Sequence, residues 1–308
     1  MNNEELKNYI ENNKSLFSIK SSVSHPGLQV LKYNRKVFYN NLWNEFFEQC
    51  RGTVVDDKFN VVAYPFTKIY NYGIEENAPV LAPETEVTAY RKVNGFMAAV
   101  SCYNNDLLIS TTGSTDSDFV GYAKEMMELH MPLSKWKDVI CSPENQKYTF
   151  LFECVHPKDP HIIVETPGMY FLAKRERAWG SQINGFGLEC ANEWKQFAET
   201  ELNCFSVDYF MTTIGELTEI VKTVKHEGFI FYCKDGTASK LKSPYYLVLK
   251  WVARNPSTNK LTNVQHDFKK QINEEFYGLV DAIRKNIDEY TALSEQERLS
   301  WVRNFYTK

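Results

Sequence analysis

The spacing of hydrophobic and polar residues divides the chain into regions of different character. Residues 1–50 are mostly helical in character, with a few aromatic anchors. From Gly52 to about residue 113, short β-rich runs alternate with turn residues. TVV and VVAY flank DDKFN, and FMAAVSCY and LLISTT flank NND. Because Asn and Asp tolerate turn dihedrals, both arrangements predict β-hairpins.

The middle of the chain mixes helical and strand patterns. Residues 117–136 predict a helix, and residues 215–225 predict a shorter one. The runs YTFLFECV, HIIV and MYFLAK have apolar residues on both faces, which is typical of central strands. A further strand, GFIFYC, follows the second helix and leads to KLKSPYYLVLKWV.

Helical spacing resumes at Val264. One helix face collects apolar residues at steps of four and three: Val264, Phe268, Ile272, Phe276, Leu279, Ile283 and Ile287. Another helix is expected from Ser294, because Glu297 stands three residues later as in a capping box. We predict an α+β body over residues 1–253 and a small all-helical domain over residues 254–308.

The composition indicates a globular protein without a general attraction for nucleic acid. Its 43% apolar content is sufficient for a core in a chain of 308 residues. The net charge is −4, so any phosphate-binding surface must be local. Candidate positive surfaces, each of which is also typical of a solvated face, are Lys174, Arg175 and Arg177, the stretch 234–250, and Arg254.

Cysteine usage and hydropathy predict a cytoplasmic location, which is the host cytoplasm if a phage encodes the protein. Seven cysteines stand singly without metal-ligand spacing, so we expect reduced thiols. The first residues lack a targeting pattern, and no apolar run reaches roughly eighteen residues. We therefore expect neither secretion nor a membrane partner. The six histidines lack paired spacing, which predicts surface or capping residues.

Five short segments carry the candidate chemistry. They are QCRG at 49–52, YRKVNGF around Lys92, FLFECVHP at 150–157, EGFIF at 227–231 and KLK at 240–242. A lysine three residues before a glycine is a weak signal, and alone Lys92 would be read as a surface lysine at a strand end. The order of the five segments is the informative feature.

This ordered set resembles the covalent nucleotidyltransferase superfamily of polynucleotide ligases and RNA capping enzymes. More specifically, it is similar to the RNA ligase family of the bacteriophage T4 RNA ligase 1 type, over roughly residues 45–252. That likeness rests on QCRGTVV, YPFTKIYNYG, FECVHP, FLAKRE and KLKSPYYLVLK. It implies a nucleotidyltransferase (adenylyltransferase) domain of antiparallel sheets with flanking helices, ahead of the small helical domain.

The resemblance implies an ATP-dependent RNA ligase. Lys92 would attack the α-phosphorus of ATP, AMP would pass to an RNA 5′-phosphate, and a 3′-hydroxyl would displace AMP. The implied cofactors are ATP as AMP donor and Mg²⁺, for which Mn²⁺ can substitute. The implied partner is RNA with 5′-phosphate and 3′-hydroxyl ends, and we expect a monomer.

Two alternatives stay open from the sequence. The first, from the same superfamily, is an mRNA capping guanylyltransferase or a DNA ligase, although no OB-fold pattern follows KLK. The second, from another class, is a catalytically inactive nucleotide- or RNA-binding protein. Against the second, every charged position that the mechanism most needs is filled.

Lys92 can act as a nucleophile only if its surroundings lower its pKa. A phosphoramidate forms from a neutral amine, whereas free lysine has a pKa of about 10.4. Burial and nearby cations lower such a pKa, and Arg91, Lys240 and Lys242 are available if the last strand lies beside Lys92. Because Lys240 and Lys242 alternate in a strand, both point to one side, where they could grip the α-phosphate as pyrophosphate leaves.

The resemblance gives roles to two carboxylates. Glu153 lies in an apolar strand, where a carboxylate is costly unless it is paired. It would contact the ribose or help to place Lys92, or else form a salt bridge at the core edge. Glu227 would bind the divalent metal, since Mg²⁺ prefers oxygen ligands; otherwise it is an exposed glutamate at a strand start.

Further roles follow from the resemblance alone. Arg51 and Lys68 would contact phosphate or metal-bound water. Phe171 would stack on adenine, or else belong to the core. Gly95 would permit the close turn that presents Lys92 to the phosphate.

Three departures limit the resemblance. Asn94 stands where the family commonly has aspartate, and Thr112 stands where the phage member has lysine. The tail after residue 255 is much shorter than the phage enzyme's C-terminal domain, which is associated with the choice of tRNA. Which RNA is joined, and whether tRNA repair is the role, therefore stays open.

Overall fold

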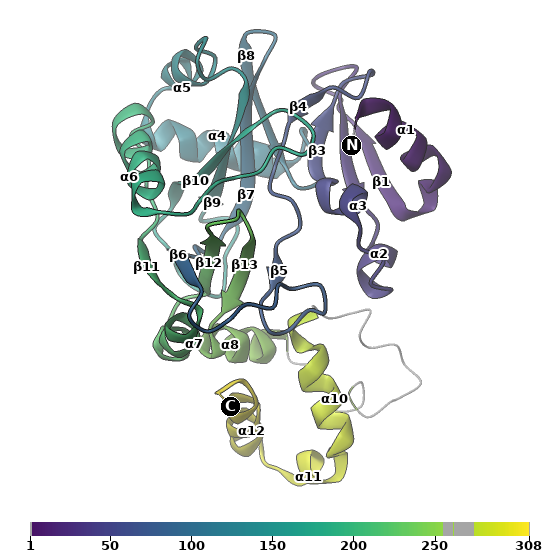
Figure 1. Ribbon diagram of the computed structural model, residues 1–308, viewed down its shortest axis with the longest axis vertical. Helices are drawn as coiled ribbons and strands as arrows, with labels where there is room; N and C mark the ends of the chain where they lie inside the picture. Colours follow the sequence, from purple (N-terminus) through teal and green to yellow (C-terminus); the bar gives the residue numbers. More distant parts are fainter. Residues whose placement is uncertain (1, 255–260, 262–273, 308) are drawn as a thin grey trace. The chain divides into compact units, whose positions relative to one another are not determined.

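The computed structural model describes residues 2–254, 261 and 274–307. Two compact units make up the chain (Figure 1). Unit 1 contains Met1–Lys68, Gly95–Pro160 and Glu165–Asp208. Unit 2 contains Ile69–Asn94, His161–Val164 and Tyr209–Lys308. The chain therefore passes between the units more than once, and the segment YRKVNGF is divided after Asn94.

The first sheet of unit 1 is formed by β1 to β4, which pair antiparallel in chain order. Their bounds are Phe17–Ser21, Gln29–Tyr33, Arg51–Val55 and Val61–Ala63. The same part of the chain contains α1 (Asn3–Asn12), η1 (Lys14–Leu16), α2 (Arg35–Tyr39) and α3 (Glu45–Gln49). The expectation of a mostly helical segment over residues 1–50 was wrong for β1 and β2. Only the first of the five side chains of β1 is buried, so hydrophobic spacing does not reveal this strand.

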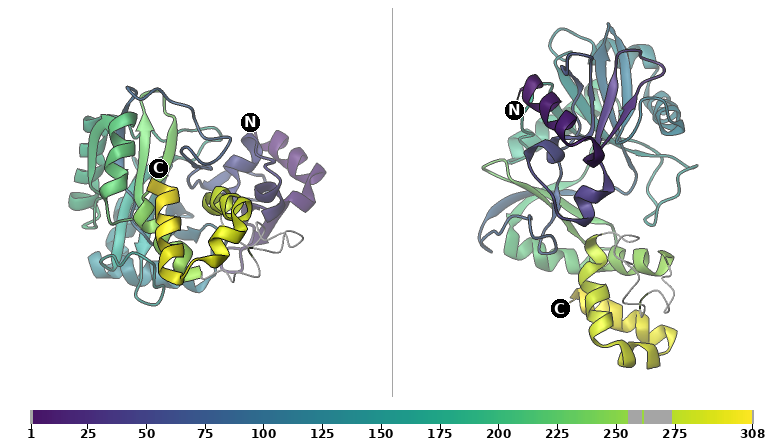
Figure 2. Two further views of the ribbon diagram at one scale, coloured as in Figure 1. Left: turned by 90° about the horizontal axis from the view of Figure 1, so that it is seen from below. Right: turned by 90° about the vertical axis from the view of Figure 1, so that its right-hand side faces the viewer.

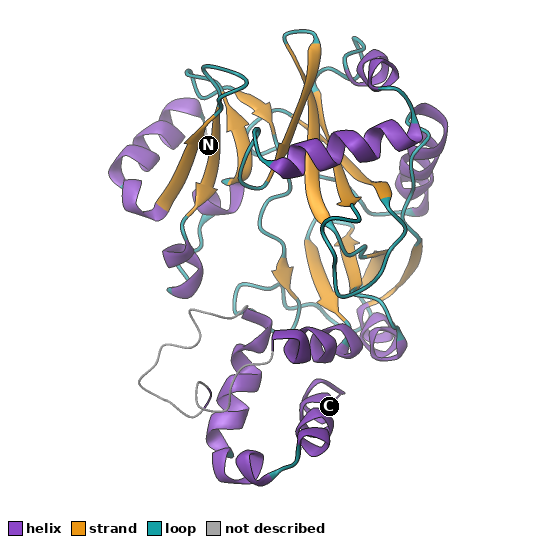
Figure 3. Ribbon diagram, turned by 180° about the vertical axis from the view of Figure 1, so that it is seen from behind, coloured by secondary structure: helices purple, strands orange, loops and turns teal. Residues whose placement is uncertain are grey.

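The second sheet of unit 1 is also antiparallel and has the order β10-β9-β7-β8. The bounds are Phe96–Tyr103 for β7, Asp106–Thr111 for β8, Tyr148–Val155 for β9 and Gly168–Glu176 for β10. Helix α4 (Asp118–His130) lies across this sheet (Figure 3). The remaining helices of unit 1 are α5 (Leu133–Ile140), α6 (Leu188–Gln196) and the π-helix η2 (Phe197–Glu201).

Both predicted hairpins are confirmed, because β3 pairs with β4 and β7 pairs with β8. Asn104 and Asn105 turn the second hairpin with φ of 51° and 57°, in the left-handed region that asparagine tolerates. The single helix predicted over residues 117–136 is instead α4 followed by α5. Pro132 separates them, since proline cannot donate the backbone hydrogen bond that would continue α4.

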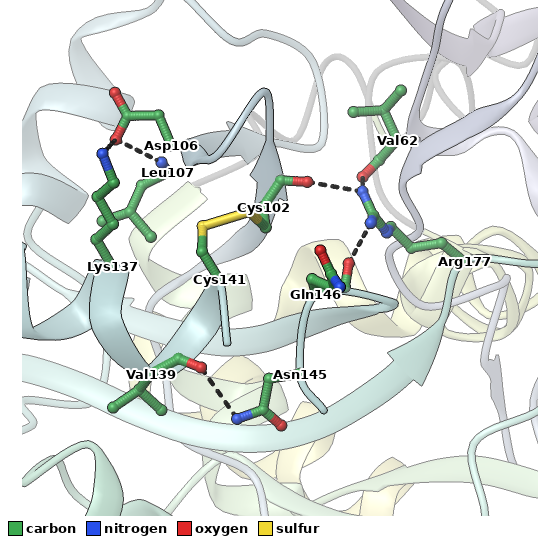
Figure 4. Close-up of a disulfide and its surroundings, with 10 residues drawn as sticks. All are labelled: Val62, Cys102, Asp106, Leu107, Lys137, Val139, Cys141, Asn145, Gln146 and Arg177. Carbon is green, nitrogen blue, oxygen red and sulfur yellow. Dashed lines mark hydrogen bonds and ion pairs between the residues drawn. A yellow bond between two sulfur atoms is a disulfide. The ribbon is translucent and has the colours of Figure 1, made fainter. Parts of the chain in front are cut away.

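Cys102 and Cys141 form a disulfide in unit 1 (Figure 4). The bond joins β7 to the residue after α5, and the two cysteines are 39 positions apart in the sequence. The expectation of reduced thiols was therefore wrong for this pair. Folding brings their Cα atoms to 5.0 Å, a distance suited to a disulfide, although no sequence spacing relates them. The free cysteines are Cys50, Cys154, Cys190, Cys204 and Cys233.

Unit 2 is built on one sheet with the order β11-β6-β12-β13-β5, which is antiparallel except where β13 meets β5. The bounds are Tyr70–Asn71 for β5, Glu86–Arg91 for β6, Tyr209–Thr213 for β11, Gly228–Cys233 for β12 and Ala238–Lys242 for β13. Helix α7 (Ile214–Thr223) confirms the predicted short helix. Helix α8 (Pro244–Arg254) begins with proline, which is favourable at a first helical position.

The strand predicted for HIIV at residues 161–164 was wrong, because this segment forms no strand. It lies between Pro160 and Pro167, neither of which can donate to a β-ladder. Ile162 and Ile163 instead pack against the core formed by α8 and the C-terminal helices.

The C-terminal helices of unit 2 are coloured yellow in Figure 2. They comprise η4 (Glu274–Phe276), α10 (Tyr277–Lys285), α11 (Ile287–Ala292) and α12 (Glu295–Thr307). Hydrogen bonds between Ser294 and Glu297 confirm the predicted capping box. No helix in the part of the chain that the structure describes is long and apolar enough to span a membrane.

These helices share one core with α8. From the predicted apolar face, Phe276, Leu279 and Ile283 are fully buried there. Val264, Phe268 and Ile272 lie outside the described residues. The predicted division between residues 253 and 254 is not a boundary between the two units, and a separate C-terminal domain stays a prediction.

Candidate active site

Three neighbouring strands of unit 2 bring the predicted catalytic side chains together. Strand β12 lies between β6 and β13, and the backbone N–H of Lys92 donates to the carbonyl of Gly228 at 2.9 Å. Gly228 also pairs with Lys242 on the other side of β12. Because Glu227 immediately precedes β12, its carboxylate lies between Lys92 and Lys242.

Glu227 is the centre of this cluster and is 3% exposed. Its Oε2 accepts hydrogen bonds from Lys92 Nζ at 3.1 Å and Asn94 Nδ2 at 2.7 Å, and its Oε1 lies 3.6 Å from Lys242 Nζ. Burial acts to raise the pKa of Glu227, but the charges of Lys92 and Lys242 and the hydrogen bonds outweigh it and hold the pKa below its usual range. Glu227 is therefore an ionised, buried carboxylate.

Lys242 is held between two carboxylates. Its Nζ lies 3.1 Å from Oε1 of Glu275 in addition to its contact with Glu227. Burial acts to lower the pKa of Lys242, but the charges of Glu275 and Glu227 outweigh it and raise the pKa above its usual value. The ammonium form of this buried lysine is stabilised accordingly.

The acidic pair Glu274 and Glu275 was missed from the sequence. Glu275 also accepts a hydrogen bond from Lys250, and Oε1 of Glu274 lies 4.0 Å from Lys240 Nζ. Burial acts to raise the pKa of Glu275, but Lys242 and Lys250 outweigh it, and the pKa lies well below its usual range. These glutamates stand beside the predicted apolar face at Phe276, but no motif marks them.

The surroundings of Lys92 contain a carboxylate as well as one of the expected cations. Its Nζ forms an ion pair with Glu227, and the other carboxylate oxygen of Glu227 lies 3.6 Å from Lys242. Lys240 and Lys242 alternate along β13, as predicted for two residues on one face.

Asn94 connects two segments of unit 2 and is 5% exposed. Its Nδ2 donates to Glu227, and its Oδ1 accepts from the backbone N–H of Ile163 at 3.1 Å. An aspartate here would set a carboxylate against Glu227 in place of an amide donor. The amide is therefore matched to an ionised Glu227.

Unit 1 holds the other predicted residues, of which Gly95 and Glu153 contact each other. The backbone N–H of Gly95 donates to Glu153 Oε1 at 3.1 Å. A Cβ at Gly95 would lie 2.4 Å from the carbonyl oxygen of Cys154. Close approach to β9 is thus the reason for glycine at this position, and Glu153 anchors the start of β7.

Arg51 and Lys68 have different surroundings. Arg51 stands directly opposite Lys32 in the β2–β3 pairing, and such like-charge pairs are unfavourable without an anion nearby. Burial, followed by the charges of Arg51 and Arg35, lowers the pKa of Lys32. Lys68 is 7% exposed, and its Nζ lies 4.6 Å from the ring centre of Trp43.

Phe171 has the surroundings of a core residue. It is 3% exposed, and its ring centre lies 5.5 Å from that of Phe152 and 5.4 Å from that of Phe197. A role in stacking on adenine therefore stays a prediction.

The candidate positive surface around residues 174–177 was wrong for two arginines. Arg175 is 3% exposed and donates to the backbone carbonyls of Pro65 and Ser181. Arg177 donates to the carbonyl of Cys102 at 2.8 Å and to Val62 (Figure 4). Both satisfy buried carbonyls and stabilise the fold of unit 1. The side chain of Arg254 lies outside the described part of the chain.

The metal-binding prediction concerns Glu227 alone. Among the described residues, no group of three or more His, Cys, Asp or Glu side chains could hold a metal ion. Mg²⁺ often keeps several waters and takes only one or two carboxylates. Glu227, whose oxygens contact Lys92, Asn94 and Lys242, stays a predicted Mg²⁺ ligand.

Comparisons with known proteins identify a family for this chain and solved structures of similar fold. The family model described as RNA ligase matches residues 49–250. A putative ATP-dependent DNA ligase from Aquifex aeolicus is 16% identical with a TM-score of 0.58, covering 97% of this chain and 77% of that one. Form 1 of an archaeal ATP-dependent RNA ligase is 15% identical with a TM-score of 0.57, covering 97% and 74%. Form 2 is 16% identical with a TM-score of 0.56, covering 98% and 76%.

At these identities the structural likeness shows the fold, which confirms the predicted α+β architecture of antiparallel sheets with flanking helices. No curated protein sequence matches the chain.

Proposed function

We propose, from the premise that this chain belongs to the RNA ligase family, that it seals RNA through a covalent lysyl-AMP intermediate on Lys92. The observation that carries the proposal is the cluster of Lys92, Lys242 and the buried Glu227, assembled from three adjacent strands. Its charges suit the transfer of a phosphoryl group, in which catalysis depends on positioning and electrostatic stabilisation.

In the first step, Nζ of Lys92 forms a bond to the α-phosphorus of ATP, and the bond from that phosphorus to the pyrophosphate oxygen breaks. The attacking amine must be neutral, whereas an ion pair with a carboxylate stabilises the ammonium form. Lys92 therefore has to lose a proton to solvent, and its contact with Glu227, before it attacks. Glu227 lies where it contacts the ammonium form of Lys92 before the reaction and can release the amine when the nucleotide binds.

Glu227 and the lysines of β13 have complementary roles. Glu227 would hold Mg²⁺, which when bound neutralises phosphate charge and orients the phosphates. Lys240 and Lys242 would contact the phosphate oxygens, since an ammonium group is a strong donor to an anion. Arg51, Lys68, Glu153 and Phe171 keep their predicted roles toward phosphate, ribose and adenine.

The later steps act on RNA ends. The RNA 5′-phosphate displaces Lys92 from AMP, and the 3′-hydroxyl of a second end then displaces AMP to form the phosphodiester. RNA would be bound mainly through its phosphates and ends, by a cytoplasmic monomer.

Intact mass after incubation with ATP and Mg²⁺ tests the proposal. We expect one added AMP in the wild-type protein and in Lys285→Ala, which changes an exposed lysine of α10. Lys92→Ala and Lys92→Arg should carry none, because arginine lacks the nucleophilic amine. An adduct that survives in either Lys92 variant would contradict the assignment, and preferential labelling by α-labelled GTP would favour the capping alternative.

A further inference from the structure

Glu275 is fixed in unit 2 through both its side chain and its backbone. The residue is 4% exposed, and its carboxylate accepts from Lys242 at 3.1 Å and from Lys250. Its backbone carbonyl accepts from the hydroxyl of Tyr306 at 2.9 Å. The next residue, Phe276, is fully buried in the core shared with α8. This carboxylate is therefore part of the packed structure.

Glu274, the neighbouring residue, accepts a hydrogen bond from Asn71 at 3.2 Å and lies farther from its lysine. Its side chain is 14% exposed and lies 4.0 Å from Lys240, compared with 3% and 3.1 Å for Glu275 and Lys242. The two adjacent glutamates thus differ in how firmly they hold a lysine of β13.

Among the described residues, the ion pairs around Glu275 join more lysines than carboxylates. Two ammonium groups, Lys242 and Lys250, share one carboxylate. When Lys92 and Glu227 are included, three lysines face two glutamates, so the net formal charge is +3 − 2 = +1. The net charge of these five side chains alone would attract an anionic phosphate.

The hydrogen-bond donors of Lys242 explain how the neighbouring carboxylates could orient its ammonium group. A lysine ammonium has three N–H donors. Glu227 and Glu275 lie within 3.6 Å and 3.1 Å of its Nζ, and the ring centre of Tyr246 lies 5.3 Å away, so the two carboxylates fix how the ammonium group is oriented. Glu227 also forms an ion pair with Lys92, so the contacts of Glu227 change when Lys92 reacts. Glu275 is anchored through Lys250 and Tyr306, and it can hold Lys242 throughout.

We infer that Glu275 is a positioning residue that orients Lys242 toward the phosphates of ATP, a role that rests on the proposed function. The C-terminal segment is thereby part of the adenylylation site, although the nucleotidyltransferase motifs end before it.

Single-turnover adenylylation with α-labelled ATP tests this inference. Glu275→Gln keeps the shape of the side chain and removes its charge. We expect the rate at saturating ATP to fall about 10-fold to 100-fold, as for residues that orient a primary ligand. The matched control Glu289→Gln, which changes an exposed glutamate of α11, should keep the wild-type rate.

A double-mutant cycle separates positioning from general stabilisation. If Glu275 acts through Lys242, then Glu275→Gln in a Lys242→Met background should change the remaining rate by less than about twofold. Should Glu275→Gln fail to fold, Glu275→Asp gives the same test, because it keeps the charge and withdraws it by one methylene. In a protein that already carries Lys242→Met, Glu275→Asp should likewise cause no further loss of rate.

Two results would overturn the inference. One is a wild-type rate in a folded Glu275→Gln protein. The other is a faster rate or tighter ATP binding in that variant, which would mean that the carboxylate competes with phosphate for Lys242. A wild-type protein that forms no AMP adduct would instead overturn the proposed function, so the two failures are distinct.

Discussion

The two units satisfy their buried charges in different ways. In unit 2, Lys242 and Glu227 are paired with side chains of opposite charge from other segments. In unit 1, Arg175 donates to two backbone carbonyls at 2.5 Å, and its guanidinium carbon lies 3.4 Å from the ring centre of Tyr64. Both arrangements offset the cost of burying charge.

The difference indicates which buried charges can take part in a reaction and which only stabilise the fold. A backbone carbonyl cannot leave its arginine without local unfolding, so the contacts of Arg175 fix the structure. A lysine and a carboxylate can exchange partners when a phosphate or a cation arrives, since both are long side chains with several donors or acceptors. Loss of function and loss of stability should therefore separate between the two units.

The largest expected effect is on the reaction, in unit 2. Glu227→Gln should slow adenylylation about a thousandfold, the upper size for loss of one electrostatic contact to a transition state. The measurement is single-turnover labelling with ATP and Mg²⁺, beside a melting curve. The control is Glu219→Gln, which changes an exposed glutamate of α7. Normal labelling with a large fall in melting temperature would make Glu227 a structural residue.

The corresponding change in unit 1 should act on stability. Arg175→Met should lower the free energy of unfolding by about 3 kcal/mol, because the carbonyls of Pro65 and Ser181 lose their charged donor. The adenylylation rate of the folded protein should stay unchanged. Urea unfolding gives the first quantity, and Lys147→Met, at an exposed ion pair, is the control. A slower reaction with unchanged stability would place Arg175 in the reaction and remove the contrast.

Sequence reasoning succeeded where the relevant signal is local. The hairpin at Asn104 and Asn105 follows from turn residues, and the capping box at Ser294 follows from residues three positions apart. The order of the motifs placed Lys92, Glu227 and Lys242 in one predicted site. The structure brings these three together, because their strands are neighbours in one sheet.

The failures arise from contacts that sequence spacing does not encode. Glu275 meets Lys242 across 33 positions, and nothing in EEF indicates that its carboxylate faces a lysine. Arg175 belongs to a run that is typical of a solvated face, but it enters the core because carbonyls of unit 1 lie around it. Asn94 seemed to weaken the resemblance, yet its amide donates to the carboxylate beside it.

Asn94 offers a sharper test within unit 2. Asn94→Asp should lower the free energy of unfolding at neutral pH by about 2 kcal/mol, because a donor to Glu227 becomes a like charge. Asn94→Ala, which removes the donor without adding charge, should cost less. Urea unfolding of both variants measures the difference. Equal losses in the two variants would mean that repulsion between the carboxylates contributes nothing.

The smallest expected effect is the contribution of Glu227 to the pH dependence of the free energy of unfolding in acid. The folded-state pKa of Glu227 lies below its ordinary value of 4.5, so the unfolded chain binds the proton more readily. The contribution of ionised Glu227 to the free energy of unfolding is therefore complete above about pH 4.5, and it is lost as the pH falls toward the folded-state pKa. The free energy of unfolding of the wild type, measured in urea, should fall between about pH 5 and pH 3, and Glu227→Gln should show a shallower decline over the same roughly two units. Equal slopes would mean that protonation of Glu227 does not limit stability in acid, and that the ion pairs of unit 2 contribute to the reaction alone.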